Sequence, residues 1–221
     1  MNRNESLIIS YLTMRRLIGI LGMALPIIVV VGGFLQNEFV IEGSISGYYY
    51  TNMRDFFVGI LCVVGLFLAS YKGYEKIDSV VAMTSGMSAF GMVIFPTGMF
   101  TGKSVNVGMF LLPDNISGYI HLTFGAIFFL SLAYNSLFLF TRRHPGVMGK
   151  EKKRRNVIYR VCGVVMIVTI LGIIIYTFFL KDTYLAKFNP VLMLESIALL
   201  AFGISWIVKG NTLFKDKKAS Y

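Results

Sequence analysis

Hydrophobic residues along the chain gather in six long blocks that short polar stretches separate. The blocks cover residues 17–35, 53–71, 79–97, 117–140, 157–180 and 190–208. Because a helix rises about 1.5 Å per residue, roughly 20 apolar residues cross the hydrocarbon core of a bilayer. The pattern therefore predicts an all-α membrane protein: one integral membrane domain over residues 1–221, built as a bundle of six transmembrane helices.

The composition points to the same class. Of the 221 residues, 56% are hydrophobic and only 14% are charged, whereas about a quarter of the residues in a soluble domain are charged. The first apolar block follows Arg15 and Arg16, as the core of a signal peptide would. It is longer than a usual signal core, and no small-residue cleavage site follows it. We therefore expect it to be retained as the first helix.

The basic residues alternate from one end of the predicted bundle to the other. Seventeen Lys and Arg fall before the first block, after the last, in the second connection, or in the fourth connection and the first turn of the block that follows it. The other connections and the block ends beside them hold four: Arg54, Lys103, Lys181 and Lys187. Since cytoplasmic loops carry the excess of Lys and Arg, we expect both termini in the cytoplasm.

The net charge of +10 does not indicate nucleic-acid binding, because long apolar blocks separate the basic residues and no nucleic-acid motif is present. The most basic connection, residues 141–156, is interpreted as a topology anchor beside anionic headgroups. A site for a protein partner is the second interpretation of this loop.

Ionisable residues at membrane depth are costly and therefore mark candidate sites. Four of them fall at the outer ends of three predicted helices: Arg54, Asp55, His121 and Glu195. No cation lies within a turn of Glu195 on its own helix. We therefore expect Glu195 to be protonated, or paired with Arg54 or His121 from another helix.

These residues predict a polar pocket that opens toward the outer leaflet. The candidates for catalysis are His121, Glu195 and Asp55, and the candidates for ligand binding are Arg54, Ser46, Tyr49 and Thr97. A serine (Ser44 or Ser46), His121 and one of the two carboxylates could form a nucleophile, base and orienter, although no nucleophile elbow is present.

Each candidate also has a structural interpretation. Asp55 complements a helix dipole, the tyrosines form an interfacial belt, and His121 bonds a loop carbonyl. No metal site is expected, because the other histidine, His144, falls on the inner side. No cofactor is expected either.

Short motifs in this order resemble a known family. Residues Ser44-Ile45-Ser46 precede a tyrosine run and Met53-Arg54-Asp55-Phe56, and later come Ile94-Phe95-Pro96-Thr97 and Gly118-Tyr119-Ile120-His121. The sequence resembles bacterial six-helix membrane proteins related to the damage-regulated autophagy modulator (DRAM) superfamily, some of whose eukaryotic relatives are linked to lipid remodelling. The resemblance implies a multi-pass protein of a bacterial inner (plasma) membrane. Ceramidase-type membrane hydrolases are a fainter resemblance, from which this chain departs by having a single outer histidine.

Three functions are compatible with this sequence. The first is recognition or handling of a lipid or other amphiphile in the outer polar pocket, which makes membrane lipids the expected partners. The second is a membrane-embedded lipid-modifying enzyme, a hydrolase or an acyl or head-group transferase that uses His121. The third is a non-catalytic scaffold or partner subunit. The sequence specifies neither the ligand nor the oligomeric state.

Overall fold

The computed structural model describes residues 3–36, 41–98, 105–142 and 149–210. Its long helices are α1 (Arg3–Leu35), α2 (Arg54–Ala69), α3 (Lys76–Ile94), α4 (Asp114–Tyr134), α5 (Lys150–Ile175) and α6 (Pro190–Lys209). Two π-helical turns, η2 (Asn135–Leu139) and η3 (Tyr176–Leu180), continue α4 and α5, and two 3-10 turns are η1 (Ser46–Tyr50) and η4 (Tyr184–Phe188). Strands β1 (Asn106–Val107) and β2 (Leu112–Pro113) form one short antiparallel pair. The predicted all-α class is confirmed.

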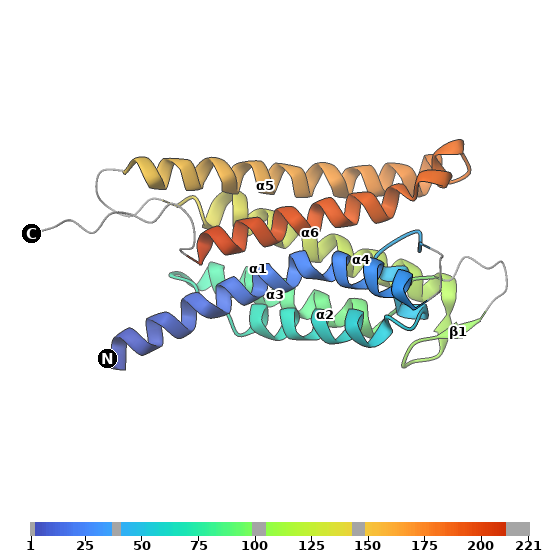
Figure 1. The fold of residues 1–221 in the computed structure, drawn as a ribbon, viewed down its shortest axis with the longest axis horizontal. Helices are drawn as coiled ribbons and strands as arrows, with labels where there is room; N and C mark the ends of the chain where they lie inside the picture. Colours follow the sequence, from blue (N-terminus) through green and yellow to red (C-terminus); the bar gives the residue numbers. More distant parts are fainter. Residues whose placement is uncertain (1–2, 37–40, 99–104, 143–148, 211–221) are drawn as a thin grey trace, which may run out of the picture.

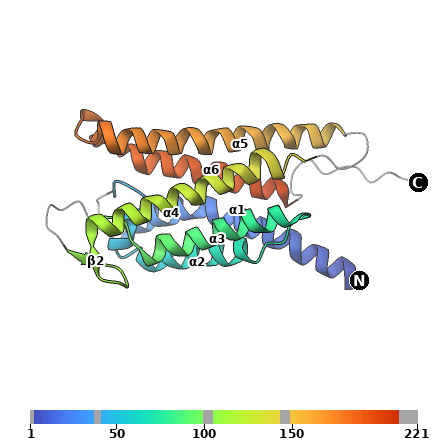
Figure 2. The ribbon, with the colours of Figure 1, turned by 180° about the vertical axis from the view of Figure 1, so that it is seen from behind.

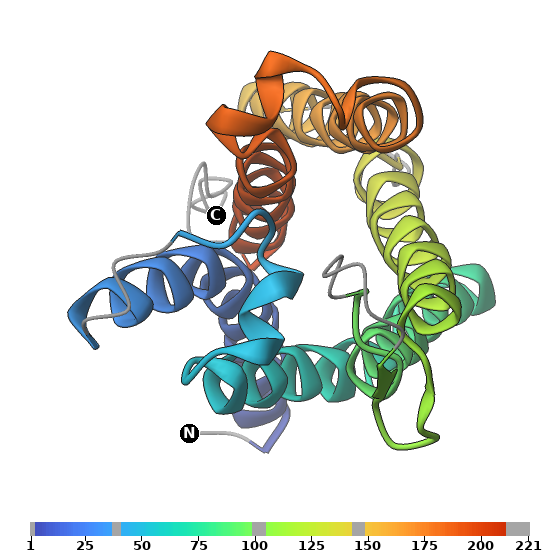
Figure 3. The same ribbon diagram turned by 90° about the vertical axis from the view of Figure 1, so that its right-hand side faces the viewer.

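The long helices lie side by side along the long axis of the molecule (Figure 1). Seen down that axis, they form a ring in chain order, which closes where α6 packs against α1 (Figure 3). Helices α2 to α5 each contact the helices before and after them in the chain, and α1 and α6 contact each other.

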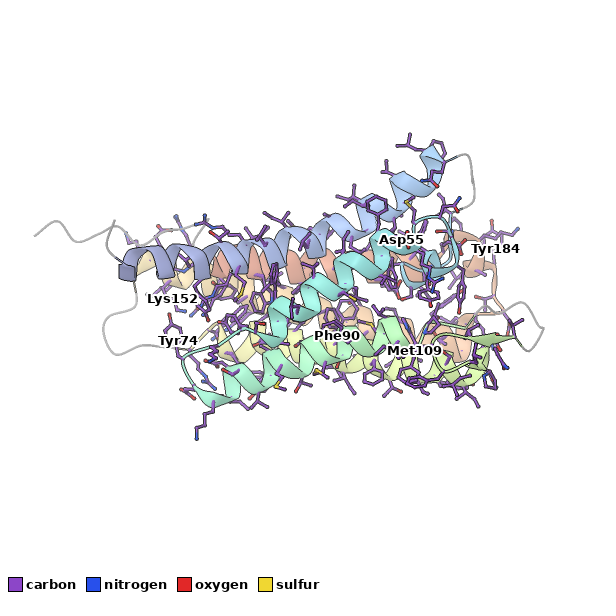
Figure 4. All side chains as sticks on the ribbon, turned by 90° about the horizontal axis from the view of Figure 1, so that it is seen from below. Asp55, Tyr74, Phe90, Met109, Lys152 and Tyr184 are labelled. Carbon is purple, nitrogen blue, oxygen red and sulfur yellow. The ribbon has the colours of Figure 1, made fainter. Side chains whose placement is uncertain are left out.

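The ring has two chemically different ends. The hairpin end carries η1, β1–β2 and η4, with Asp55, Met109 and Tyr184, whereas the opposite end carries Tyr74 and Lys152 (Figure 4). This second end, which we call the basic end, also holds the other Lys and Arg of residues 150–155. At the basic end, Arg16 Nε donates to the carbonyl of Gly210, 3.0 Å away. The start of α1 and the end of α6 are therefore at the same end of the ring.

Within the described residues, five helices are long and apolar enough to cross a membrane: Tyr11–Leu35, Lys76–Ile94, Asp114–Leu139, Lys150–Leu180 and Pro190–Lys209. Their outward faces carry large apolar side chains, among them Ile27 (59% exposed), Val80 (57%) and Val168 (59%). Exposed apolar faces on so many helices indicate that lipid is their solvent.

Several helix bounds differ from those predicted. Helix α1 begins at Arg3 and α5 at Lys150, well before the apolar blocks that start at residues 17 and 157. In α5, Lys, Arg and Glu sustain the helix beyond the apolar block, whereas in α1 the apolar span itself begins earlier than predicted, at Tyr11. Helix α2 has 16 residues and ends at Ala69, two residues before the predicted end.

Glycines set the closest helix contacts. A Cβ on Gly19 of α1 would lie 2.6 Å from the carbonyl oxygen of Gly203 in α6, and one on Gly86 of α3 would lie 2.5 Å from that of Gly65 in α2. Both contacts are with backbone, which cannot rotate away. Small residues at such positions let membrane helices approach closely.

At the basic end, Arg15 of α1 is buried among aromatic rings. Its guanidinium lies 4.3 Å from the ring centre of Tyr11, and it donates to the Tyr71 hydroxyl (3.1 Å) and the Lys209 carbonyl (3.4 Å). Tyr71 in turn packs edge-on against Trp206, 5.1 Å away. This cluster joins α1, α6 and the segment after α2.

Candidate functional site

The segment before α2 folds back into the hairpin end of the ring. The backbone N–H of Gly47 donates to Ser44 Oγ (2.9 Å), and Thr51 Oγ1 donates to the carbonyl of Tyr48 (3.0 Å). Serine and threonine hydroxyls support tight turns in this way. The resulting turn η1 buries the side chains of Ser46 and Tyr48.

His121 of α4 connects η1 to the end of α3. Its Nδ1 lies 3.0 Å from the Met92 carbonyl and 2.9 Å from the Phe95 carbonyl, and its Nε2 lies 2.9 Å from Ser46 Oγ. Because carbonyl oxygens can only accept hydrogen bonds, Nδ1 carries a proton. In the neutral imidazole, Nε2 is then the acceptor, and the Ser46 hydroxyl donates to it.

Glu195 of α6 approaches the same hydroxyl from the other side. Its Oε2 accepts from the backbone N–H of Ile45 (2.5 Å), and its Oε1 lies 3.4 Å from Ser46 Oγ. The hydroxyl has one proton, so His121 and Glu195 compete for it, and the shorter contact is with His121. Ser46 therefore links His121 to Glu195, although the sequence predicted that Glu195 is protonated or pairs with Arg54 or His121.

These three residues form the polar end of a cavity of about 80 Å³. All six long helices and η1 contribute to its wall, and every other lining residue is apolar or glycine. Pockets for small molecules have this composition, with apolar walls and a few placed polar groups. The arrangement suits a ligand with an apolar body and one polar group.

Between α4 and α5, several residues that line the cavity are only partly buried. Further toward the basic end these helices touch, because Gly163 of α5 packs against Leu137 and the carbonyl of Ala133. Toward the hairpin end they diverge (Figure 2). The lining residues there are only half-buried: Leu122, Gly125, Ala126, Ile173 and Ile174. A ligand could reach the cavity between these two helices.

The other sequence-predicted residues do not line the cavity. Arg54 donates to the Tyr49 hydroxyl (2.8 Å) and lies 4.4 Å from the centre of its ring. Asp55 is exposed in the first turn of α2. Thr97 contributes its carbonyl, which accepts from the Tyr50 hydroxyl (2.5 Å). Burial raises the pKa of Tyr50 to about 12, so this hydroxyl keeps its proton.

Backbone groups of the site were not identified from the sequence. They are the carbonyls of Met92 and Phe95 and the N–H of Ile45. One signal was available: Pro96 has no N–H, so the Met92 carbonyl lacks the helical donor four residues on. That carbonyl is free to accept from His121.

Among the described residues, no group of three or more His, Cys, Asp or Glu could hold a metal ion. Lys103 and His144 lie outside the described residues, as does the middle of the basic connection, 143–148. No protein-family profile, curated protein or solved structure matches the chain. The resemblance to DRAM-related proteins stays a prediction.

Proposed function

We propose that the chain is a six-span protein of a bacterial inner membrane, with both termini cytoplasmic, that binds a lipid or other amphiphile from the outer leaflet. Two observations support the topology. The start of α1 lies beside the end of α6, as an even number of crossings requires. The basic residues gather at that same end, which the positive-inside rule assigns to the cytoplasm.

Helix α2 is the sixth crossing in this proposal. Its 16 residues span about 24 Å at 1.5 Å each, somewhat less than the hydrocarbon core. It lies between α1 and α3 in the ring (Figure 3). A short span of this kind is accommodated by local thinning of the bilayer.

One observation carries the binding function: the apolar cavity ends in Ser46, His121 and Glu195 and lies in the hairpin half of the ring. An acyl chain would lie between α4 and α5, with only its first carbons inside the apolar part of the cavity. Its ester or acid group would then meet the three polar side chains. Arg54 and Tyr49 lie at the same end of the bundle and would contact an anionic head that extends beyond the cavity.

The test is the lipid that remains with the purified protein. Native mass spectrometry of the wild type should detect one tightly bound lipid. Gly125→Phe places a ring in the cavity, since Gly125 lines it, and should abolish retention. Ile127→Phe is the matched control, because Ile127 lies two residues further along α4, on the exposed face and outside the cavity lining. Equal lipid retention by the two variants, both folded, would contradict the proposal.

An enzymatic function is the second candidate, and the hydrogen bond from Ser46 to His121 favours it. A scaffold function would leave the cavity without a ligand. In that case neither retained lipid nor chemistry at Ser46 would be found.

A further inference from the structure

We infer that Ser46 is the nucleophile of an acyl-transfer reaction on ester lipids, with His121 as its general base. The inference rests on the proposed function, because the acyl chain of the substrate would occupy the same cavity.

The geometry of the two side chains meets the requirements for this chemistry. A base activates a serine when it lies within hydrogen-bond distance, about 2.6–3.2 Å, and His121 Nε2 lies 2.9 Å from Ser46 Oγ. Both side chains are buried at the polar end of the cavity. The nearby Ser44 has a different role, because its hydroxyl accepts from the backbone of Gly47.

Hydrogen bonds at Nδ1, the ring nitrogen that faces away from Ser46, fix the orientation of the imidazole. A serine hydrolase uses a carboxylate to hold Nδ1–H and present Nε2 to the serine. Here two carbonyls at the end of α3, those of Met92 and Phe95, hold Nδ1. They impose the tautomer in which Nε2 can accept a proton. They bring no full negative charge, so the dyad is a weaker base than a triad.

The cavity defines the substrate class. Its walls beyond Ser46 are apolar, which suits an alkyl chain, and the ester carbonyl would stand at the polar end. Ser46 Oγ attacks the carbonyl carbon while its proton passes to His121 Nε2. The bond between the carbonyl carbon and the alcohol oxygen then breaks, and His121 returns the proton to that oxygen. The acyl group remains on Ser46 until water attacks its carbonyl carbon and gives a proton to the same Nε2. The bond from that carbon to Ser46 Oγ then breaks, Nε2 returns the proton to Oγ, and the carboxylic acid leaves.

Glu195 is a positioning residue in this reaction. It holds Ile45, the residue before the nucleophile, through the bond from Oε2 to the backbone N–H. Glu195→Gln keeps an acceptor for that N–H and should retain reactivity at Ser46. Glu195→Leu removes the acceptor and should lower it, even at a temperature where both variants are folded.

The test is covalent labelling with an alkyl fluorophosphonate, a probe for activated serines that requires no knowledge of the natural lipid. The protein is reconstituted into phosphatidylglycerol–phosphatidylethanolamine nanodiscs. Ser46 Oγ should displace fluoride from phosphorus, and peptide mass spectrometry should locate the adduct at Ser46. Ser46→Ala should abolish the adduct, and His121→Gln should slow its formation about 10²–10⁴-fold, the usual contribution of a general base. Ser70→Ala, which removes an exposed hydroxyl just after α2 and away from the cavity, is the control and should label as the wild type does.

The outcomes separate the two proposals. If the folded wild type retains lipid but gives no adduct at Ser46, the acyl-transfer inference is overturned and the binding function stands. An adduct that forms equally fast in His121→Gln also overturns it, because the serine would then not depend on the base. If an adduct forms at Ser46 but no lipid is retained by the untreated protein, tight amphiphile binding fails while the nucleophile is supported. The wild-type labelling site decides the question even if a His121 variant does not fold.

Discussion

Glu195 of α6 accepts a hydrogen bond from the backbone N–H of Ile45, although 150 positions of sequence separate the two residues. The adjacent backbone bond, from the N–H of Leu192 to the carbonyl of Gly43 (3.0 Å), reinforces this connection. Together they attach the segment before η1 to the first turns of α6. The position of Ser46 over the cavity therefore depends on α6 as well as on α4.

Replacing Glu195 should distinguish this acceptor role from a need for charge. Glu195→Leu leaves the N–H of Ile45 without an acceptor, which costs about 1–3 kcal/mol when the donor is buried. Glu195→Gln supplies a carbonyl oxygen and should remain close to the wild type. Thermal unfolding in detergent measures the difference. A Gln variant as unstable as the Leu variant would mean that the negative charge, and not the acceptor, matters.

The contact between α1 and α6 should not tolerate a methyl group at Gly19. Gly19→Ala would place a Cβ 2.6 Å from the Gly203 carbonyl, and the two helices would have to separate. Overpacking of this kind costs about 1–3 kcal/mol. Gly59→Ala is the control, because a Cβ at Gly59 of α2 meets nothing within 4 Å. We expect a lower melting temperature for the first variant alone, and similar melting of both would disprove the close approach.

Arg15 should contribute much more to stability than an exposed arginine of α5 does. It is 6% exposed and combines a ring contact with two hydrogen bonds. Arg15→Met should lose about 2–4 kcal/mol, from the range of cation–π contacts and of hydrogen bonds to charged groups. Arg160→Met serves as the control, since Arg160 of α5 is exposed. Equal effects on the melting temperature would show that the aromatic surroundings of Arg15 add nothing.

Cysteine accessibility tests the proposed topology in a background in which Cys62 and Cys162 are replaced by serine. Lys187→Cys, at the hairpin end, should react with an impermeant maleimide in intact cells. Lys150→Cys, at the start of α5, should react only after permeabilisation, because the basic end faces the cytoplasm in this proposal. Lys103→Cys should behave like the first variant and Lys218→Cys like the second. Labelling of Lys150→Cys in sealed cells would reverse the orientation.

The helices could be predicted from the sequence because a helix that crosses a lipid bilayer requires a long block of apolar residues. Long apolar blocks have no other explanation in a chain with so few charges. The ends were less predictable: α5 begins seven residues before its block, since Lys150 to Asn156 are polar but still helical. Hydropathy reports the solvent of a helix, and hydrogen bonding decides where the helix stops.

The site was predicted in part, for a similar reason. His121, Glu195 and Ser46 stood out as polar residues near apolar blocks, and the structure brings them together. Arg54 and Asp55 were predicted at the same depth in the membrane as these three residues, but they lie on the exposed side of α2. A sequence gives the depth of a residue along a helix, whereas the face it occupies depends on how the ring of helices closes.

The contact of α1 with α6 has a consequence for the order of assembly. A chain is synthesised from its N-terminus, so Gly19 and Arg15 are in the bilayer long before Gly203 and Lys209 exist. Until α6 arrives, one side of α1 has no permanent neighbour, and the buried guanidinium lacks the Lys209 carbonyl that accepts from it. The packing of α6 therefore completes the contacts of α1. In a chain truncated after α5, the Arg15 guanidinium would lack the Lys209 carbonyl as a hydrogen-bond acceptor.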